Sequence, residues 1–174
     1  MFEKRTKVFI ILLIFLLIGG IAWRYLAVFP LPADDVEHIV VDTWRNRLHF
    51  YTGAGEVLHF SVATGKKPEE TPRGKFQIVR KSVLNPPETN PQLGVRWLGL
   101  DVPNEEGGSK YGIHGTDEPE SIGQHASAGC IRMYNDDVIF LYEKVPKRTP
   151  VFVRDIPLPV KWFYQYYWGL PGDD

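Results

Sequence analysis

The sequence has only one cysteine, Cys130, so no disulfide can form within its 174 residues. It has no excess of charge, since 20 basic and 21 acidic residues give a formal net charge of −1, and nothing in this balance indicates a nucleic-acid partner. It also has no phosphate-binding loop and no dinucleotide fingerprint. What remains is an ordinary globular composition, with 44% hydrophobic residues, and a length that allows one domain plus an appendage.

One long hydrophobic run stands near the N-terminus, where residues 8–23 carry no charge and follow a basic segment at residues 1–7. A membrane-spanning helix needs about 20 apolar residues, and the apolar character continues to residue 29. We expect residues 1–7 to be a cytoplasmic end, 8–29 a single-pass anchor and 30–36 a linker. A cleaved signal peptide is the alternative, which would make the protein secreted. Both interpretations place the rest of the chain outside the cytoplasm.

Alternating and β-branched segments predict a mainly β domain over residues 37–154. The expected strands cover residues 37–42, 45–52, 56–63, 75–80, 94–100 and 149–154, with a hairpin turn at 53–55. One helix is expected, with Asn135 as its N-cap, a stripe of Val138, Leu141, Tyr142 and Val145, and Pro146 at its end. About seven short strands and one helix predict a sandwich or a closed barrel.

Three other segments have a distinct composition. Residues 64–74 form a polar loop, and residues 101–110 form an acidic loop long enough to act as a lid. The tail at 155–174 holds six aromatic residues between Trp162 and Trp168. We expect the tail to pack onto the domain; the alternative is contact with the membrane interface or with a substrate.

The stretch 111–132 contains the groups that a thiol nucleophile needs: Cys130, His114, the flexible Gly129 and the cation of Arg132. A free cysteine has a pKa of about 8.5, so it needs a base to become a thiolate near neutral pH. A lone cysteine is more often a small buried hydrophobe. However, an exported chain usually pairs its cysteines or has none, so a single one kept in this setting favours a reactive thiol.

These motifs resemble the L,D-transpeptidase catalytic domain family, the YkuD-like domain. That family has an Ile-His-Gly segment followed, after a gap, by Ser/Thr-x-Gly-Cys, an apolar residue and Arg or Asn. The corresponding segments here are Ile113-His114-Gly115 and Ser127-Ala128-Gly129-Cys130-Ile131-Arg132. The likeness extends back through Thr71-Pro72-Arg73-Gly74-Lys75-Phe76 and forward through Asn135-Asp136-Asp137, and it covers residues 37–154.

The resemblance implies a bacterial enzyme of peptidoglycan biosynthesis, anchored in the cell membrane with its catalytic domain outside. Cys130 would attack the stem peptide, release D-alanine and keep the acyl group as a thioester, which the amine of a neighbouring stem converts into a cross-link. His114 would be the base. Other expected roles are site shaping or oxyanion binding for Gly129, Ser127 and Gly115, and substrate binding for Arg132, Tyr111 and Thr116. Arg132 could equally be a structural ion pair.

Several alternatives remain open on the sequence. Many family members have His where this chain has Ala128, and His125 is a second candidate base, although an exposed loop histidine is the simpler interpretation. His114, His125 and Cys130 match no standard zinc spacing, so no metal and no other cofactor is expected. Water in place of the acceptor amine would make the protein an L,D-carboxypeptidase, a hydrolase. A catalytically silent wall-binding module is the alternative outside the enzymes.

Overall fold

The structure is a computed structural model that describes residues 36–84, 90–103 and 110–155, together with Gly19. The strands of these ranges are β1 (His38–Asp42), β2 (Arg47–Tyr51), β3 (Val57–Ser61), β4 (Thr64–Gly65), β5 (Gly74–Val83), β6 (Arg96–Leu100), β7 (Gly112–His114), β8 (His125–Ser127), β9 (Ile131–Arg132) and β10 (Pro150–Arg154). The helices are α2 (Asn135–Lys144) and two 3-10 turns, η1 (Pro91–Leu93) and η2 (Pro119–Ser121).

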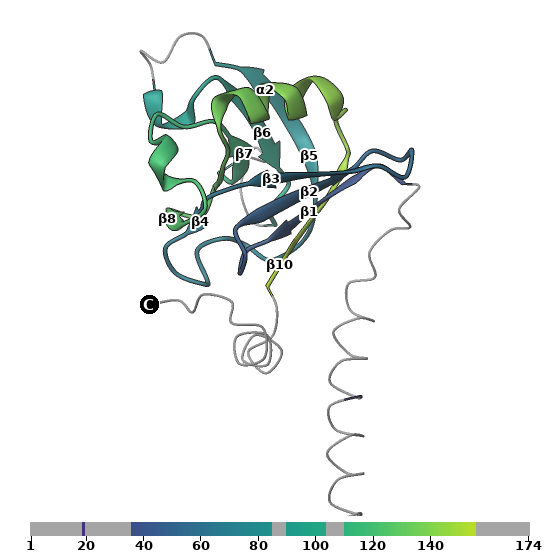
Figure 1. The fold of residues 1–174 in the computed structure, drawn as a ribbon, viewed down its shortest axis with the longest axis horizontal. Helices are drawn as coiled ribbons and strands as arrows, with labels where there is room; N and C mark the ends of the chain where they lie inside the picture. The colour runs from purple at the N-terminus through teal and green to yellow at the C-terminus, as the bar shows by residue number, and fades with distance from the viewer. Residues whose placement is uncertain (1–18, 20–35, 85–89, 104–109, 156–174) are drawn as a thin grey trace, which may run out of the picture. The chain divides into compact units, whose positions relative to one another are not determined.

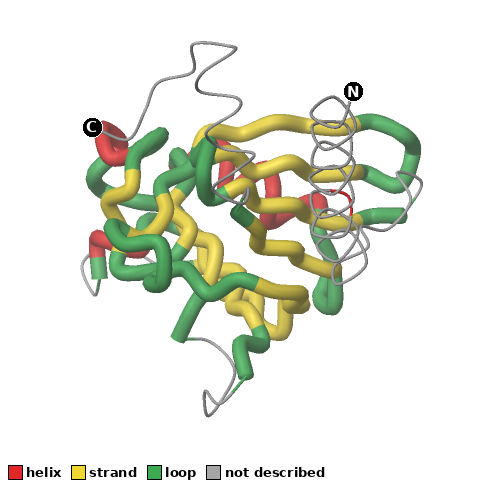
Figure 2. Tube along the Cα trace, turned by 90° about the horizontal axis from the view of Figure 1, so that it is seen from below, coloured by secondary structure: helices red, strands yellow, loops and turns green. Residues whose placement is uncertain are grey.

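Eight strands form one mixed sheet in the order β3-β2-β1-β10-β5-β6-β7-β9, and β4 and β8 form a small parallel pair beside it (Figure 1). The pairs β1–β10 and β7–β9 are parallel, and the other neighbours in the large sheet are antiparallel. The sheet curls until Ala63, just after β3, forms a bridge with Arg132 of β9. Figure 2 shows neighbouring strands side by side along this curved surface.

The sequence prediction of a mainly β domain with one short helix is confirmed. In place of a sandwich or a closed barrel, the chain forms a single curled sheet whose edges touch at one bridge. The edges do not close further because β9 is only two residues long and offers little backbone to pair with.

The core lies between the concave sheet and α2. All five residues of β1 are buried, as expected for a strand with neighbours on both sides. Helix α2 contributes Val138 and Leu141, both 0% exposed, and Tyr142 packs against the same core. Each such fully buried aliphatic side chain contributes about 1.5–3 kcal/mol. The helix stripe predicted from the sequence is therefore the face that covers the sheet.

The six predicted strands and the hairpin are present, with boundaries close to those expected, and β5 continues to Val83. The sequence pattern missed β4, β7, β8 and β9, which have two or three residues each and are too short for a visible alternation. As a result, the predicted polar loop 64–74 in fact begins with a paired strand.

The predicted helix cap is wrong. Helix α2 ends at Lys144 before Pro146, as expected, but Tyr134 is the N-cap and no side chain caps the helix. Asn135 is the first helical residue, and its side-chain amide is engaged with Thr116. With its amide turned towards Thr116, Asn135 leaves the start of the helix without a side-chain cap.

The expected anchor at 8–29, most of the linker, the centre of the acidic loop and the aromatic tail beyond residue 155 lie outside the described residues. Among the helices that the structure does describe, none combines the length and the apolar character needed to cross a bilayer.

Candidate active site

The parallel pairing of β7 with β9 brings His114 beside the strand that directly follows Cys130. The register aligns Ile113 with Ile131 and His114 with Arg132. Ile113 and Ile131 point into the core, at 0% and 1% exposed. Since side chains alternate along a strand, His114 and Arg132 point to the other face. Cys130 directly precedes β9, and the charge of Arg132 acts on both His114 and Cys130.

His114 is held as a neutral imidazole. Its side chain is buried, at 3% exposed, and its Nδ1 lies 2.6 Å from the carbonyl oxygen of Gly115. A carbonyl can only accept, so Nδ1 carries the proton and Nε2 keeps its lone pair. Burial lowers the pKa of His114 to about 4, and the charge of Arg132 acts in the same direction. The ring stacks on Trp97, with centroids 5.4 Å apart and planes 21° apart.

Cys130 is a half-buried thiol in the resting enzyme. Burial raises the pKa of its thiol, while a hydrogen bond from the Gly112 backbone and the charge of Arg132 act to lower it. Its Sγ donates to the carbonyl oxygen of Lys110 at 3.6 Å, and not to His114. Near neutral pH, Cys130 is therefore mostly a neutral thiol and His114 a neutral imidazole.

The loop before the thiol depends on Gly129. Its φ is +120°, and a Cβ built there would lie 2.3 Å from the carbonyl oxygen of Glu70. Ser127 Oγ accepts the Gly129 N–H at 3.0 Å and donates to the Cys130 carbonyl at 2.6 Å. Ser127 thus fixes the turn, and it engages the Gly129 N–H that sequence reasoning assigned to an oxyanion. It donates to a backbone carbonyl and not to the imidazole.

Arg132 has a structural partner. Its Nη1 lies 2.5 Å from Glu118 Oε2 and 3.4 Å from Ser121 Oγ, which ties β9 to the turn η2. Its side chain is 14% exposed, whereas that of Glu118 is 51% exposed. Of the two interpretations that the sequence left open, the structure contains the ion pair that braces the loop.

Asn135 clamps the loop that follows His114, and the sequence analysis missed this role. Its Oδ1 accepts the Thr116 N–H at 3.2 Å, and its Nδ2 donates to the Thr116 carbonyl at 3.0 Å. A Cβ at Gly115 or at Gly94 would fall 2.1 or 2.3 Å from Asn135 Oδ1, so only glycine fits at either position. Thr116 is 3% exposed and is part of this packed loop rather than an open pocket wall. The position of Asn135 in the family motif was the available signal.

Tyr111 lies against the nucleophile loop. A Cβ at Gly129 would be 2.8 Å from Tyr111 Cε1, and the ammonium of Lys110 lies 5.5 Å from the centre of the Tyr111 ring. The ring thus borders the loop that carries Cys130 and is half-buried. Of the predicted substrate-binding residues, Tyr111 is the one in contact with this loop.

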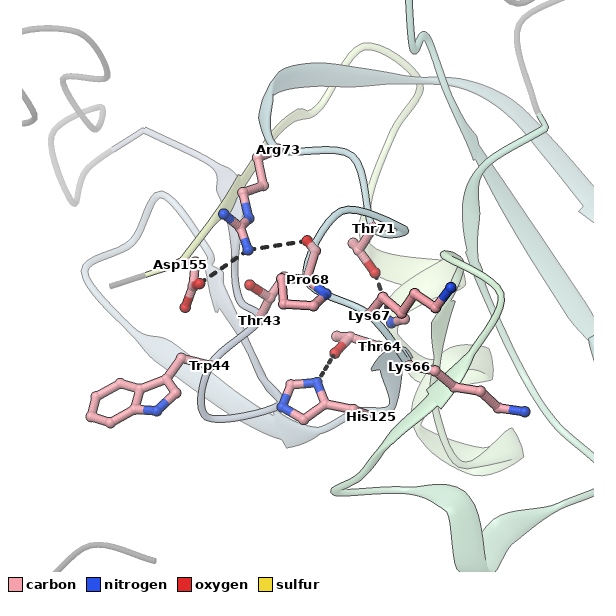
Figure 3. Close-up of a pocket in the computed structure, with 11 residues that line it drawn as sticks. Thr43, Trp44, Thr64, Lys66, Lys67, Pro68, Thr71, Arg73, His125 and Asp155 are labelled. Atoms are coloured by element: carbon pink, nitrogen blue, oxygen red, sulfur yellow. Dashed lines mark hydrogen bonds and ion pairs between the residues drawn. The ribbon is translucent and has the colours of Figure 1, made fainter. Parts of the chain in front are cut away.

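His125, the second candidate base, is in a different place. Its Nδ1 lies 3.0 Å from Thr64 Oγ1, and this hydroxyl donates to Asn46 Oδ1 at 2.6 Å. His125 lines a separate cavity of about 230 Å³, which neither Cys130 nor His114 lines (Figure 3). Within the ranges that the structure describes, no three His, Cys, Asp or Glu side chains are grouped closely enough to hold a metal ion.

Known proteins share this fold and these motifs. The family model for the L,D-transpeptidase catalytic domain, YkuD, matches residues 36–153. The putative L,D-transpeptidase YqjB of Bacillus subtilis is 37% identical over 135 residues, which cover 72% of this chain and 74% of the relative. The putative L,D-transpeptidase YkuD of Bacillus licheniformis is 40% identical over 121 residues, which cover 69% of this chain and 67% of the relative.

Among solved structures, the Ldtfm–avibactam carbamoyl enzyme is 30% identical, with a TM-score of 0.54 and coverage of 72% of this chain. The present chain spans only 50% of that protein. Because the family model matches more than half of the chain, and curated relatives above 30% identity agree with it, the chain belongs to the L,D-transpeptidase catalytic domain family of enzymes.

Proposed function

We propose that this peptidoglycan L,D-transpeptidase works through a thioester on Cys130, with D-alanine as the leaving group. The observation that carries the proposal is the register of β7 and β9, which aligns His114 with Arg132, two residues after Cys130, while the Gly115 carbonyl fixes the imidazole tautomer. A nucleophile, a base and a group that orients the base are the parts required for covalent acyl transfer.

In the first step, His114 Nε2 takes the thiol proton as the Cys130 sulfur attacks the carbonyl carbon of the third stem residue, at its L-centre. The tetrahedral intermediate collapses with cleavage of the amide bond. The imidazolium returns the proton to the departing amine of D-alanine, and the acyl group stays on sulfur as a thioester. The neutral resting state suits this sequence, because His114 is unprotonated and ready to accept at neutral pH.

In the second step, an amine from a neighbouring stem attacks the thioester carbonyl and gives up a proton to His114. The carbon–sulfur bond breaks, a new amide forms, and the thiol is regenerated. Water in place of the amine would release a tripeptide acid, which is the carboxypeptidase outcome. The Cys130 N–H is our candidate for the oxyanion donor, since the Gly129 N–H is already engaged by Ser127.

The other residues have supporting roles in this proposal. Arg132 braces the turn at Glu118 and also lowers the pKa of the Cys130 thiol through its charge. Tyr111 borders the nucleophile loop and is the candidate contact for the substrate. Gly115, Thr116 and Ser127 hold the backbone around the two catalytic side chains.

We also propose that residues 8–29 anchor the enzyme in the cell membrane, with residues 37–154 on the outer side, where stem peptides are found. The support is the uncharged run at residues 8–23 and the basic segment before it. Fractionation of cells that produce the full chain checks this. A protein in the membrane fraction, at its full mass, is expected, whereas a soluble shortened protein in the medium would mean that the segment is cleaved.

The catalytic proposal is tested by intact mass measurement of the full chain in detergent, mixed with a disaccharide-tetrapeptide and quenched early. We expect an adduct equal to the substrate minus its terminal alanine on the wild type, and none on Cys130→Ala. Released dimers would then identify cross-linking, and released tripeptides would identify hydrolysis. A folded wild-type protein that gives neither adduct nor product would contradict the thioester mechanism and leave the wall-binding module.

A further inference from the structure

Trp97 on β6 is a large side chain that lies next to His114 and outside the hydrophobic core. On the same strand, Leu98 and Leu100 belong to the core cluster. Because side chains alternate along a strand, Trp97 points to the opposite face of the sheet. It is nevertheless only 9% exposed. Packing of the core therefore does not explain why an indole is present at this position.

The pairing of β6 with β7 places the indole on the face of the imidazole. The register aligns Trp97 with His114, on two strands that lie side by side (Figure 1). The ring centroids are 5.4 Å apart and the planes differ by 21°, which is a stacked arrangement. The second side-chain torsion of histidine has only a broad preference of its own, so the plane of the ring has to be set by its contacts. The Gly115 carbonyl acts in the ring plane at Nδ1, and the indole acts on the ring face.

The indole also extends over the part of β7 that contacts the thiol. A Cβ built at Gly112 would lie 2.7 Å from Trp97 Cζ2, so the indole fills the space that a side chain at this position would take. The Gly112 backbone hydrogen-bonds the Cys130 thiol and acts to lower its pKa. The indole therefore packs on the imidazole itself and on the residue whose backbone contacts the sulfur.

The indole is part of the cover that keeps the imidazole from water. Burial is the largest cause of the lowered pKa of His114, which is about 4. The charge of Arg132, which is paired with Glu118, acts in the same direction, whereas the carbonyls of Gly115 and Leu93 act to raise this pKa. A histidine that stays neutral down to about pH 4 remains able to accept a proton in acidic surroundings.

We propose that Trp97 is a positioning residue that acts through His114: its indole sets the plane of the imidazole and keeps water from one face of the ring. The proposal rests on the proposed function in one respect, since His114 is the base of that mechanism. A misplacement of about 1 Å at a catalytic group can cost about 100-fold in rate, so a side chain that does not touch the substrate can set kcat. The alternative is a packing role, in which loss of Trp97 lowers stability without changing the properties of His114.

The kinetic test compares Trp97→Leu, which stays apolar but has no flat face, with Trp97→Phe, which keeps one. Acyl-enzyme formation on a disaccharide-tetrapeptide is measured against pH with the full chain in detergent. For Trp97→Leu we expect kcat to fall about 10- to 100-fold with little change in KM, and the acidic limb of kcat/KM to move from about pH 4 towards 6.5. Trp97→Phe should restore most of the rate and the wild-type limb.

Trp44→Leu is the matched control for the loss of a buried indole. Trp44 is 8% exposed, and the guanidinium carbon of Arg45 lies 4.6 Å from its ring centre. This variant should lose stability in thermal unfolding but keep the wild-type pH profile. A Trp97→Leu variant that behaves in the same way, with an unchanged acidic limb, would leave Trp97 with a packing role and overturn the proposal.

A second measurement does not depend on turnover. The NMR signal of the His114 C2 proton, assigned with His114→Gln, is followed against pH in the full chain without substrate. In the wild type we expect the ring current of the indole to shift this signal upfield, with a titration midpoint near pH 4. Trp97→Leu should lose the upfield shift and raise the midpoint, and Trp97→Phe should keep both. A signal that is unchanged in Trp97→Leu would contradict the proposal.

Two further outcomes are separated by these measurements. If Trp97→Leu does not fold, the wild-type signal decides, since an ordinary chemical shift with a midpoint near 6.5 would refute the contact of the indole with the imidazole. If no thioester forms on the wild type, the kinetic comparison fails together with the proposed function. The NMR titration then still decides whether Trp97 holds the ring of His114.

Discussion

The two candidate catalytic side chains, Cys130 and His114, are kept neutral, whereas the cavity lined by His125 contains an ion pair of Arg73 with Asp155. Burial lowers the pKa of His114 to about 4 and raises that of the Cys130 thiol, so both are uncharged at neutral pH. Arg73 and Asp155 instead face each other at 3.0 Å near the surface. Neutral groups can exchange a proton near neutral pH, whereas a formed ion pair holds two segments of the chain together.

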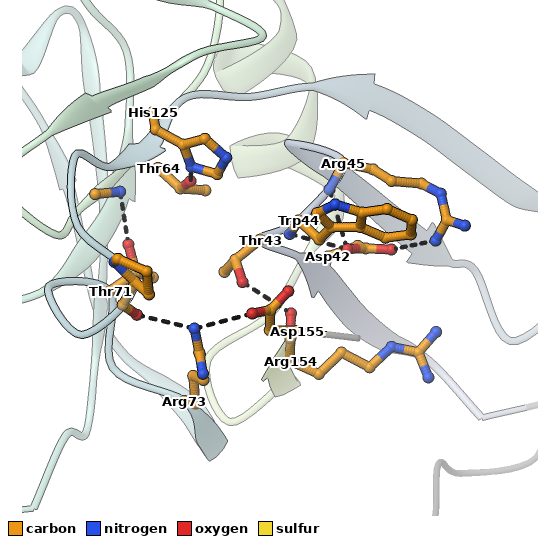
Figure 4. A network of polar contacts seen from close by, with 12 residues as sticks. Asp42, Thr43, Trp44, Arg45, Thr64, Thr71, Arg73, His125, Arg154 and Asp155 are labelled. Atoms are coloured by element: carbon orange, nitrogen blue, oxygen red, sulfur yellow. Dashed lines mark hydrogen bonds and ion pairs between the residues drawn. The ribbon is translucent and has the colours of Figure 1, made fainter. Parts of the chain in front are cut away.

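The two regions also differ in how they are held. The catalytic face is fixed by backbone: the β7–β9 ladder, the Gly115 carbonyl and the positive φ of Gly129. The cavity is fixed by side chains that reach across from separate segments (Figure 4). Substitutions at the first region should therefore affect turnover and stability together, whereas substitutions of the cavity's side chains should leave the backbone around Cys130 in place.

The largest effect is expected for His114→Gln. Loss of a positioned general base costs about 10²- to 10⁴-fold in rate. In the wild type, kcat/KM should fall on the acidic side of about pH 4, the pKa of His114, because the protonated ring cannot accept the thiol proton. A pH profile of acyl-enzyme formation checks both points. His59→Gln, on an exposed strand position, is the control and should act like the wild type. A retained acidic limb in His114→Gln would assign the base elsewhere.

The same histidine should make stability depend on pH. Its ordinary pKa is 6.5 and its folded pKa is about 4, so the unfolded chain binds more protons between these values. The contribution is fully present above about pH 6.5 and is lost as the pH falls to about 4, a difference of about 3 kcal/mol in the free energy of unfolding. Urea unfolding at several pH values checks this. The free energy of unfolding should change less with pH in His114→Gln than in the wild type. An equal pH dependence would mean that the ring takes up its proton as readily in the folded chain as in the unfolded chain.

Gly129→Ala should destabilise the nucleophile loop by about 2–4 kcal/mol and slow acylation, because its Cβ meets the Glu70 carbonyl in a strained backbone conformation. Gly123→Ala is a matched control. Gly123 also has a positive φ, of +92°, but a Cβ there meets nothing within 4 Å. Thermal unfolding of both variants separates the cost of the positive φ, which both share, from the cost of the contact with Glu70, which only Gly129→Ala has. Equal losses in the two would show that the contact with Glu70 is unimportant.

Asn135→Ala removes both hydrogen bonds to Thr116 and leaves the loop after His114 without its clamp. We expect a loss of about 1–3 kcal/mol in stability and a lower kcat with little change in KM, since the imidazole is held less firmly. Steady-state kinetics and urea unfolding measure the two effects. Asp136→Ala, the exposed neighbour, is the comparison. A change in KM alone would point to direct substrate contact instead of positioning.

The smallest effect is expected for Glu118→Ala. Glu118 is half exposed, and a surface ion pair is worth about 0.2–1 kcal/mol. Without Glu118, Arg132 is no longer neutralised, so the pKa of the Cys130 thiol should fall slightly. Thiol alkylation as a function of pH measures that shift. An unchanged profile would limit Arg132 to its structural role.

Much of the fold and part of the candidate site could be predicted from the sequence, for identifiable reasons. Strands of five residues or more could be predicted from alternating or β-branched segments. The helix could be predicted from its apolar stripe, which includes Val138 and Leu141. Cys130 and His114 could be proposed as catalytic residues because their motifs are local in sequence. What could not be predicted depends on tertiary contacts: the two-residue β9, the side-chain clamp of Asn135 and the ion pair of Arg132 with Glu118.

His125 illustrates the limit most clearly. Its position five residues before Cys130 made it a candidate base, yet β8 pairs with β4 and turns the ring towards Thr64 and the separate cavity that it lines. Closeness in sequence was misleading because the bend at residues 128–130 separates β8, which carries His125, from β9, which follows Cys130. The cavity itself has no sequence signature, since its lining comes from separate segments of the chain.

The chain's single thiol has a practical consequence for anyone who works with the enzyme. Because Cys130 is the one cysteine in 174 residues, each equivalent of an alkylating reagent consumed counts one reactive centre, without mutagenesis. A stoichiometry below one then measures the inactive fraction of a preparation. Covalent inhibitors can be ranked in the same way, by the thiol they leave unlabelled.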